Sequence, residues 1–263
     1  MGQLTPFDAD VIEILRQAGV IEDMNGNGID LSRGVIVIRC PDGDQMLDRI
    51  EHDRRVAMEA GVTPRIHLIT HHGGCMVVAP DAPLYPGRGI DEYVLEQIRE
   101  AEALKEIHVI SAEIHVPCGK ATSCGLTLVH QIVLQMSAKP RIKEVDPTNK
   151  VICRIHVDFA DGRKRTYFIS RAKWIAFWNA RGRALWGHLF KTDPYPLRPS
   201  YVQAAKDRRP AAPDAREKEV LAPATSEPME AVPGGALASL RAARTGPSDT
   251  LLGLERSDPF PSD

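Results

Sequence analysis

Three residues of the chain have side chains that bind transition metals, and they follow two apolar segments. Cys40 ends the run GVIVIRC (34–40), and His115 and Cys118 come shortly after the run EIHVIS (106–111). Two thiolates and one imidazole suit Zn²⁺, which favours tetrahedral coordination by such groups. The pattern therefore predicts a zinc site with Cys40, His115 and Cys118 as the metal ligands.

A fourth coordination position would remain beside these ligands, either for water or for Asp42. Gly119 follows Cys118 directly and would let the backbone turn sharply into the next helix. Taken one at a time, the same residues could be buried structural thiols, a core histidine and a turn aspartate in the stretch PDGD. Those separate explanations do not account for the joint pattern.

The elements that must position these residues alternate between strands and helices. Apolar β-branched runs predict buried strands, and apolar residues at helical spacing predict helices. The expected strands are 34–40, 65–70 and 106–111, and the expected helices are 6–18, 45–61, 89–104 and 126–138. This alternation predicts an α/β fold with a parallel β-sheet core and flanking helices. Because ligands gather at the carboxyl ends of the strands in such a sheet, the three metal ligands are expected to converge there.

The two motifs, CPD at 40–42 and HVPCG at 115–119, resemble the zinc motifs of the β-class carbonic anhydrases, Cys-x-Asp-x-Arg and His-x-x-Cys-Gly. The resemblance covers roughly residues 34–138 and includes a strand that leads to Gly73. It implies a β-carbonic-anhydrase-like fold around Zn²⁺ as the cofactor, bound by the same two cysteines and one histidine.

The resemblance also implies an activity, the reversible hydration of carbon dioxide to bicarbonate by a zinc-bound hydroxide. Asp42 would be the catalytic residue, which either accepts a hydrogen bond from the zinc-bound water or takes the fourth position itself. The small-molecule partners would be CO2 and bicarbonate, and the protein would form a homodimer or a higher homo-oligomer.

The chain departs from the family at the position where an Arg holds the Asp away from the metal. That position is Asp44, so the resemblance is to a divergent member that lacks the Arg of the Asp-Arg pair. Without this partner, Asp42 could swing onto zinc and close the site. An arginine from elsewhere could substitute, and the sequence offers Arg39, Arg65 and Arg88.

Three further departures lie outside this pair. Residues 70–73 are THHG where the family tends to have Arg-Asn-Ala-Gly, and Ile114 stands where a Gly usually precedes the His. Cys40 and His115 are 75 positions apart, a longer separation than the resemblance leads us to expect. His71 and His72 could shuttle protons, since imidazole titrates near neutrality, but we expect them to be ordinary loop residues.

Three function hypotheses follow. The leading one is a zinc lyase that hydrates CO2. The alternative is a catalytically inactive zinc protein of the same fold with a binding or regulatory role, which Asp44 favours. A hydrolase acting on another small linear molecule, such as COS or CS2, would use the same hydroxide and differ in access to the pocket.

The segment 149–202 predicts a C-terminal β-hairpin and helix. VICRIHVDF alternates, an Asp-Gly turn follows, and KRTYFIS returns. Residues 161–200 hold nine Lys and Arg against two acids, a pattern that could bind nucleic acid. We regard nucleic-acid binding as the weaker interpretation, because the helix aromatics can instead pack on the sheet or on a partner subunit. These aromatics are Trp174, Phe177, Trp178 and Trp186.

The predicted organisation has four parts. Residues 1–33 form an N-terminal helix and loop, 34–148 the zinc-binding core, 149–202 the basic hairpin-helix unit, and 203–263 a tail. The tail is rich in Pro, Ala, Arg, Glu and Ser with almost no aromatic residues, and we predict that it is disordered.

Bulk composition excludes several other classes. The net charge is −2, no apolar run approaches the roughly 18 residues of a membrane helix, and the N-terminus lacks the features of a secretory signal. The five cysteines are odd in number and widely spread, which does not suit a disulfide framework. We therefore expect a cytoplasmic protein with no membrane partner. Cys75, Cys124 and Cys153 are predicted to be core residues, with a metal role for the first two as a lesser alternative.

Overall fold

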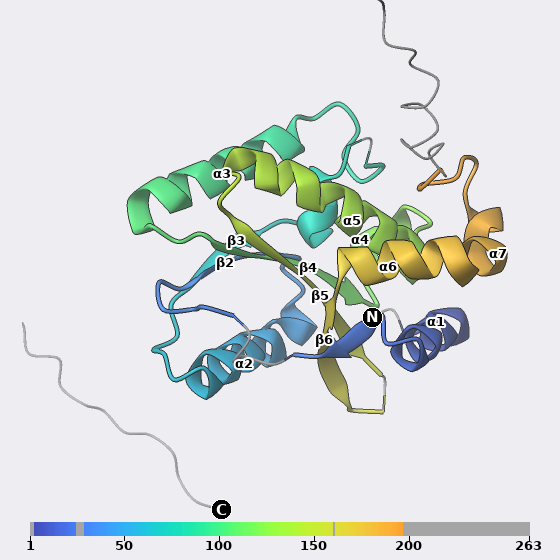
Figure 1. The fold of residues 1–263 in the computed structure, drawn as a ribbon, viewed down its shortest axis with the longest axis horizontal. Helices are drawn as coiled ribbons and strands as arrows, with labels where there is room; N and C mark the ends of the chain where they lie inside the picture. Colours follow the sequence, from blue (N-terminus) through green and yellow to red (C-terminus); the bar gives the residue numbers. More distant parts are fainter. Residues whose placement is uncertain (1–2, 25–28, 81, 160, 197–263) are drawn as a thin grey trace, which may run out of the picture. The chain divides into compact units, whose positions relative to one another are not determined.

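The computed structural model of the chain describes residues 3–24, 29–80, 82–159 and 161–196. Within these ranges the protein is α/β, with a mostly parallel sheet flanked by helices (Figure 1). The tail predicted to be disordered, 203–263, lies outside the described residues. No helix in the described ranges combines the length and the apolar character needed to cross a bilayer.

The described strands form one six-stranded sheet in the order β1-β6-β5-β4-β2-β3. Strands β3, β2, β4 and β5 run parallel to one another. Strand β6 pairs antiparallel with β5, and β1 pairs antiparallel with β6. The bounds are β1 (Ile21–Asp23), β2 (Val35–Arg39), β3 (Ile66–Thr70), β4 (Val109–Val116), β5 (Lys150–Asp158) and β6 (Lys164–Ile169). Strands β2 and β4 are adjacent in the sheet, and the predicted metal ligands lie at or just after their carboxyl ends.

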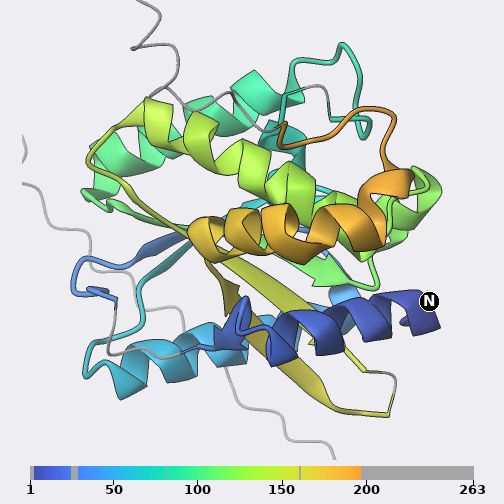
Figure 2. The same cartoon turned by 45° about the vertical axis from the view of Figure 1, so that its right-hand side comes forward.

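Helices cover both faces of this sheet. Helices α3 (Ile90–Lys105), α5 (Leu128–Val145) and α6 (Arg171–Phe177) lie on one face, and α2 (Gly43–Glu59) lies on the other (Figures 1 and 2). Helix α1 (Pro6–Gln17) packs beside α5 and β1. The short helices are η2 (Gly74–Val78), α4 (Gly119–Ser123), η3 (Trp178–Gly182), α7 (Arg183–Trp186) and η4 (Gly187–Leu189).

Strand β4 is longer than the sequence predicts. The prediction ended this strand at residue 111, whereas β4 continues to Val116 and contains His115. The extension follows from pairing, because β4 is in register with β5 from Val109 to Val116. Its alternating side chains suit a strand between two covered faces, with Ala112, Ile114 and Val116 on one side and Ser111, Glu113 and His115 on the other. His115 is therefore held by a strand and not by a loop.

The predicted hairpin is present and joins the same sheet. Strands β5 and β6 pair antiparallel, and β5 also pairs with β4 along most of its length. Both faces of β5 are covered, so Arg154 and His156 are buried although the alternating pattern suggested one apolar face. The helix predicted after the hairpin begins as α6 and continues through the π-helical turn η3. Its aromatics are buried in the main core, which confirms their packing role: Trp174, Phe177, Trp178 and Trp186.

Candidate metal centre

The three predicted ligands converge at the carboxyl ends of β2 and β4. Cys40 follows β2, His115 lies near the end of β4, and Cys118 directly precedes α4. One ligand atom from each residue lies within 4.8 Å of the other two, and all three residues are buried, with exposures of 5%, 1% and 2%. Two sulfurs that share a tetrahedral zinc ion lie roughly 3.8 Å apart, given Zn–S bonds of about 2.3 Å. The three residues therefore form a potential metal-binding group that needs little adjustment to close on an ion.

The hydrogen bonds of His115 leave one ring nitrogen available. Its Nδ1 lies 3.2 Å from Oε1 of Gln45. Its Nε2 is buried without a conventional hydrogen-bond partner, and the ring lies beside the Cys118 thiol, whose pKa it helps to lower. A buried polar atom with no partner is costly and rare in a folded protein. A metal ion bound to Nε2 would remove that cost, so the donor set fits a metal.

The two cysteines form one electrostatic unit. A hydrogen bond between the sulfur atoms lowers the pKa of Cys118 to about 4 and raises the pKa of Cys40 well above its ordinary range. The backbone amides of Gly73 and Ala121 also donate to the sulfurs of Cys40 and Cys118, respectively. A dication that bound both sulfurs as thiolates would displace the proton of this hydrogen bond.

Glycines bring the segment after β3 close to the metal ligands. Gly74 has φ of +57°, and a Cβ atom there would lie 2.5 Å from the Glu113 carbonyl oxygen and 3.2 Å from the Cys40 nitrogen. No side chain fits at that distance, so glycine is required at this approach. This close approach of the backbone lies next to Gly73, whose amide donates to the Cys40 sulfur.

Asp42 lies beside the three ligands but outside their group. It is the N-cap of α2, where its Oδ1 accepts a hydrogen bond from the Asp44 amide at 3.0 Å. Its Oδ2 is 3.9 Å from Nδ1 of His115, on the opposite side of the ring from the unpartnered Nε2. Asp44 therefore interacts with Asp42 through its backbone amide. Its side chain cannot supply the positive charge of the Arg that the resemblance places at this position.

The arginines that the sequence offered as substitutes lie elsewhere. Arg39 is buried against Asp53 and Glu113, and Arg65 donates to two backbone carbonyls at the far end of β2 and β3. Arg88 is exposed in the loop before α3. In the described part of the chain, no arginine donates to the carboxylate of Asp42.

Two residues of α2 that the sequence pattern did not single out, Gln45 and Arg49, contact the segments that carry the metal ligands. Gln45 contacts His115 through Oε1, and its Nε2 donates to the carbonyl oxygen of Pro117 at 3.3 Å. Arg49 donates to the carbonyl oxygens of Cys40 at 2.8 Å and Asp42 at 3.4 Å. The available signal was spacing, because polar side chains at 45, 49 and 53 recur every four residues and thus share one helix face. That face points inward.

A buried ionic cluster continues from Arg49 along the interface between α2 and the sheet. Glu113 accepts from Arg49 at 3.1 Å, lies 3.2 Å from Arg39 and lies 3.1 Å from Arg154. Asp53 pairs with Arg39 and with Arg154. All five residues are at most 5% exposed. Burial alone would raise the pKa of both acids, but the guanidinium groups of Arg39 and Arg154 outweigh it and hold both pKa values below their ordinary range.

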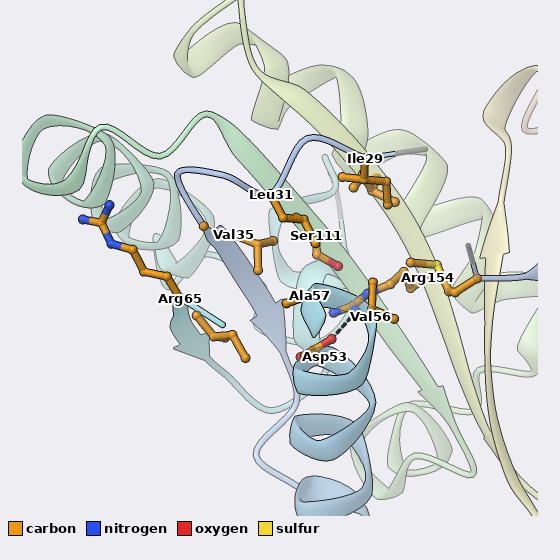
Figure 3. A pocket seen from close by; sticks show the side chains of 13 residues that line it. Ile29, Leu31, Val35, Asp53, Val56, Ala57, Arg65, Ser111 and Arg154 are labelled. Atoms are coloured by element: carbon orange, nitrogen blue, oxygen red, sulfur yellow. Dashed lines mark hydrogen bonds and ion pairs between the residues drawn. The ribbon is translucent and has the colours of Figure 1, made fainter. Parts of the chain in front are cut away.

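A small cavity lies at the other end of this interface. Asp53, Ser111 and Arg154 line it together with apolar side chains from α2 and from the start of β2 (Figure 3). Its volume is about 20 Å³, which is room for about one water molecule. The cavity is at the amino end of β2 and the metal ligands are at the carboxyl end, so the two are separate features.

The ionic cluster predicts that the protein loses stability in acid. The unfolded chain binds protons more readily than the folded chain at Asp53 and Glu113, whose ordinary pKa values are 3.8 and 4.5. Burial likewise lowers the pKa of His156 from 6.5 to about 3. The stability from these groups is therefore complete above about pH 6.5 and is lost progressively as the pH falls towards 3.

Urea unfolding midpoints measured between pH 7 and pH 3 test this expectation. The series is repeated in Cys118→Ala, in which acid release of a metal makes no contribution. A midpoint that stays constant down to pH 3 in that variant would show that the buried groups are not held in the charge states given above.

The remaining candidates occupy different surroundings. Cys75 and Cys153 are fully buried, which confirms their prediction as core residues, whereas Cys124 is half-buried near the carbonyl oxygen of Pro83. The ring of His71 packs edge-on against Tyr85 at 4.7 Å between centroids, and His72 is exposed. Neither histidine belongs to the group of three ligands.

Comparison with models of protein families finds no match to the chain, and comparison with curated proteins finds none either.

Proposed function

We propose that the protein is a zinc lyase of the β-carbonic-anhydrase type that reversibly hydrates carbon dioxide to bicarbonate. The observation that carries the proposal is the buried group of Cys40, His115 and Cys118 at the ends of two adjacent parallel strands. Two further features that belong to the resemblance support the same family. They are the order of the two motifs along the chain and the glycines Gly73 and Gly119. A homodimer or higher homo-oligomer and a cytoplasmic location belong to the proposal and rest on the resemblance and the cysteine pattern.

The three ligands would each have one task in this reaction. Cys40 and Cys118 would bind the ion as thiolates, and His115 would bind it through Nε2. A zinc ion held in this way supplies an activated water as nucleophile near neutral pH. Two thiolates balance the charge of Zn²⁺, so the ion can be held in a buried site without leaving a net charge there.

The surroundings of the ligands favour a small, uncharged substrate. All three ligands are at most 5% exposed, and Tyr85 lies close enough to Cys40 for the thiol to affect its pKa, which burial raises. Lys120, two residues after Cys118, places its Nζ 4.2 Å from the centroid of the same ring. CO2 is small, linear and uncharged, which suits a site whose ligands are this deeply buried. COS and CS2 share this shape, so they are the related substrates to compare.

The test is the CO2 hydration rate per bound zinc, measured by stopped flow from pH 7 to pH 9. That range brackets the titration expected of zinc-bound water, so a fast rate that rises with pH is the expected result. Cys118→Ala at the same protein concentration is the control and should give the buffer rate. A zinc-loaded wild-type protein that also gives the buffer rate would contradict the proposed activity.

A second candidate function is a binding or regulatory protein with a closed, structural zinc site. The observation that favours it is that Asp42 caps α2 and that no arginine among the described residues donates to its carboxylate. Under this alternative, zinc loading raises the melting temperature while the hydration rate stays at the buffer value. The same stopped-flow experiment, with a melting curve of the zinc-loaded protein, separates the two functions.

A further inference from the structure

The amide of Gln45 has only one orientation that satisfies both of its contacts. The carbonyl oxygen of Pro117 can only accept a hydrogen bond, so the NH2 group of Gln45 must face it, at 3.3 Å. The oxygen of the same amide then faces Nδ1 of His115, at 3.2 Å. An oxygen can only accept, so Nδ1 of His115 carries the proton.

This assignment fixes the chemistry of the other ring nitrogen. A neutral imidazole with its proton on Nδ1 has a bare lone pair on Nε2, the atom that is buried without a partner. Asp42 lies on the same side as Gln45, with Oδ2 3.9 Å from Nδ1, and it favours the same tautomer. The ring is thereby prepared to bind a cation through Nε2.

Arg49 contacts the end of β2, the strand that leads to the metal ligand Cys40. The carboxylates of Asp53 and Glu113 offset the charges of Arg39 and Arg154, which leaves Arg49 as the additional cation of the cluster. Its Nη2 donates to the carbonyl of Cys40, its Nε donates to the carbonyl of Gln45, and its Nη1 donates to Glu113. One guanidinium therefore joins the end of β2, the first turns of α2 and the residue two before His115.

We propose that Gln45 and Arg49 are positioning residues on α2 that hold the metal ligands in place. Gln45 acts through its contacts with His115 and Pro117, and Arg49 acts through its hydrogen bond to Cys40. They are one helical turn apart, and both are at most 3% exposed. This inference rests on the metal site of the proposed function and not on its reaction. Outer contacts of this kind typically change metal affinity by about 10- to 100-fold.

The first test compares Gln45→Leu with Gln45→Glu in the full chain. Leu removes both hydrogen bonds, so we expect zinc affinity, measured by competition with a chromophoric chelator, to fall by about 10- to 100-fold. Glu keeps an acceptor for Nδ1–H but loses the donor to Pro117, so its zinc affinity should lie between those of wild type and Gln45→Leu. Gln17→Leu changes an exposed glutamine whose side chain donates to Glu13; it is the matched control and should bind zinc as the wild type does.

Two readouts separate positioning from general loss of structure. In zinc-loaded wild type, the Nδ1 proton of His115 should give a slowly exchanging NMR signal, which Gln45→Leu should lose and Gln45→Glu should keep. The Co²⁺-substituted protein should show a shifted visible spectrum only in Gln45→Leu. A folded Gln45→Leu with wild-type zinc affinity and spectrum would overturn the role of Gln45, whatever the CO2 hydration rate proves to be.

Arg49→Lys tests the other residue without leaving Glu113 beside a neutral side chain. Lysine keeps the charge but lacks the planar fork that reaches Cys40 and Glu113 together. We expect zinc affinity to fall by about tenfold, while Arg54→Lys, an exposed change on the same helix, leaves it unaltered. Equal affinities in the two lysine variants would overturn the role of Arg49.

Discussion

We expect Cys118→Ala to abolish the binding of one zinc ion per chain that the proposed site predicts. Cys118 supplies one of three donor atoms that lie within 4.8 Å of one another, and alanine offers no replacement. The loss of a direct ligand should exceed the roughly 10- to 100-fold cost of losing an outer contact, so affinity should fall by at least about 100-fold. The measurement is metal content after equilibrium dialysis, combined with chelator competition.

Cys124→Ala is the matched control for this experiment. Cys124 lies in the same segment, is half-buried and contacts the carbonyl of Pro83 outside the ligand group. It should retain one zinc ion per chain with unchanged affinity. Full zinc content in Cys118→Ala, or equal losses in both variants, would show that the metal is held elsewhere.

Glu113→Gln is expected to destabilise the protein by about 3–5 kcal/mol. The substitution keeps the shape of the side chain but removes a buried negative charge that faces Arg39, Arg49 and Arg154. Three guanidinium groups are then left with Asp53 as the one acid of the cluster. Because an unpaired buried charge is costly, the folded state loses most of what the cluster contributes. The free energy of unfolding in urea measures the effect.

Glu92→Gln provides the comparison for a surface pair. Glu92 pairs with Arg141 at 2.6 Å, but its side chain is 66% exposed. An exposed pair of this kind is worth about 0–1 kcal/mol, so this variant should unfold close to wild type. If both variants cost the same, the cluster is hydrated and the burial described above does not hold in solution.

The sequence predicts best the helices with one apolar face and the strands with two apolar faces. Strand β2 and helices α1 and α3 match their apolar patterns within about two residues, since hydrophobic spacing is the strongest local signal. The three-ligand group could be anticipated for a related reason. Adjacent parallel strands bring their carboxyl ends together, so two motifs that follow such strands must lie close in space.

What the sequence conceals is a polar interface. The strand predicted over 106–111 ends before Glu113 and His115, although the alternation of these residues with apolar neighbours continues to Val116. On α2, the inward residues are Gln45, Arg49 and Asp53, which a hydrophobic pattern assigns to solvent. Their partners on β4 and β5 are far away in the chain. The four-residue spacing places these residues on one helix face, but it cannot show that the face is buried, because the partner of Arg49, Glu113, is 64 residues away in the chain.

The two faces of the sheet should also differ in their response to temperature. Helix α5 buries mostly apolar side chains against β4 and β5, whereas α2 buries Gln45, Arg49 and Asp53 beside only two apolar residues, Val56 and Ala57. Exposure of apolar surface raises heat capacity, and exposure of polar surface lowers it. Undocking α2 therefore has a smaller heat-capacity change per unit area than undocking α5. On cooling, the attachment of α5 should weaken more than that of α2, so the helix that contacts the metal ligands is less affected by cold than α5.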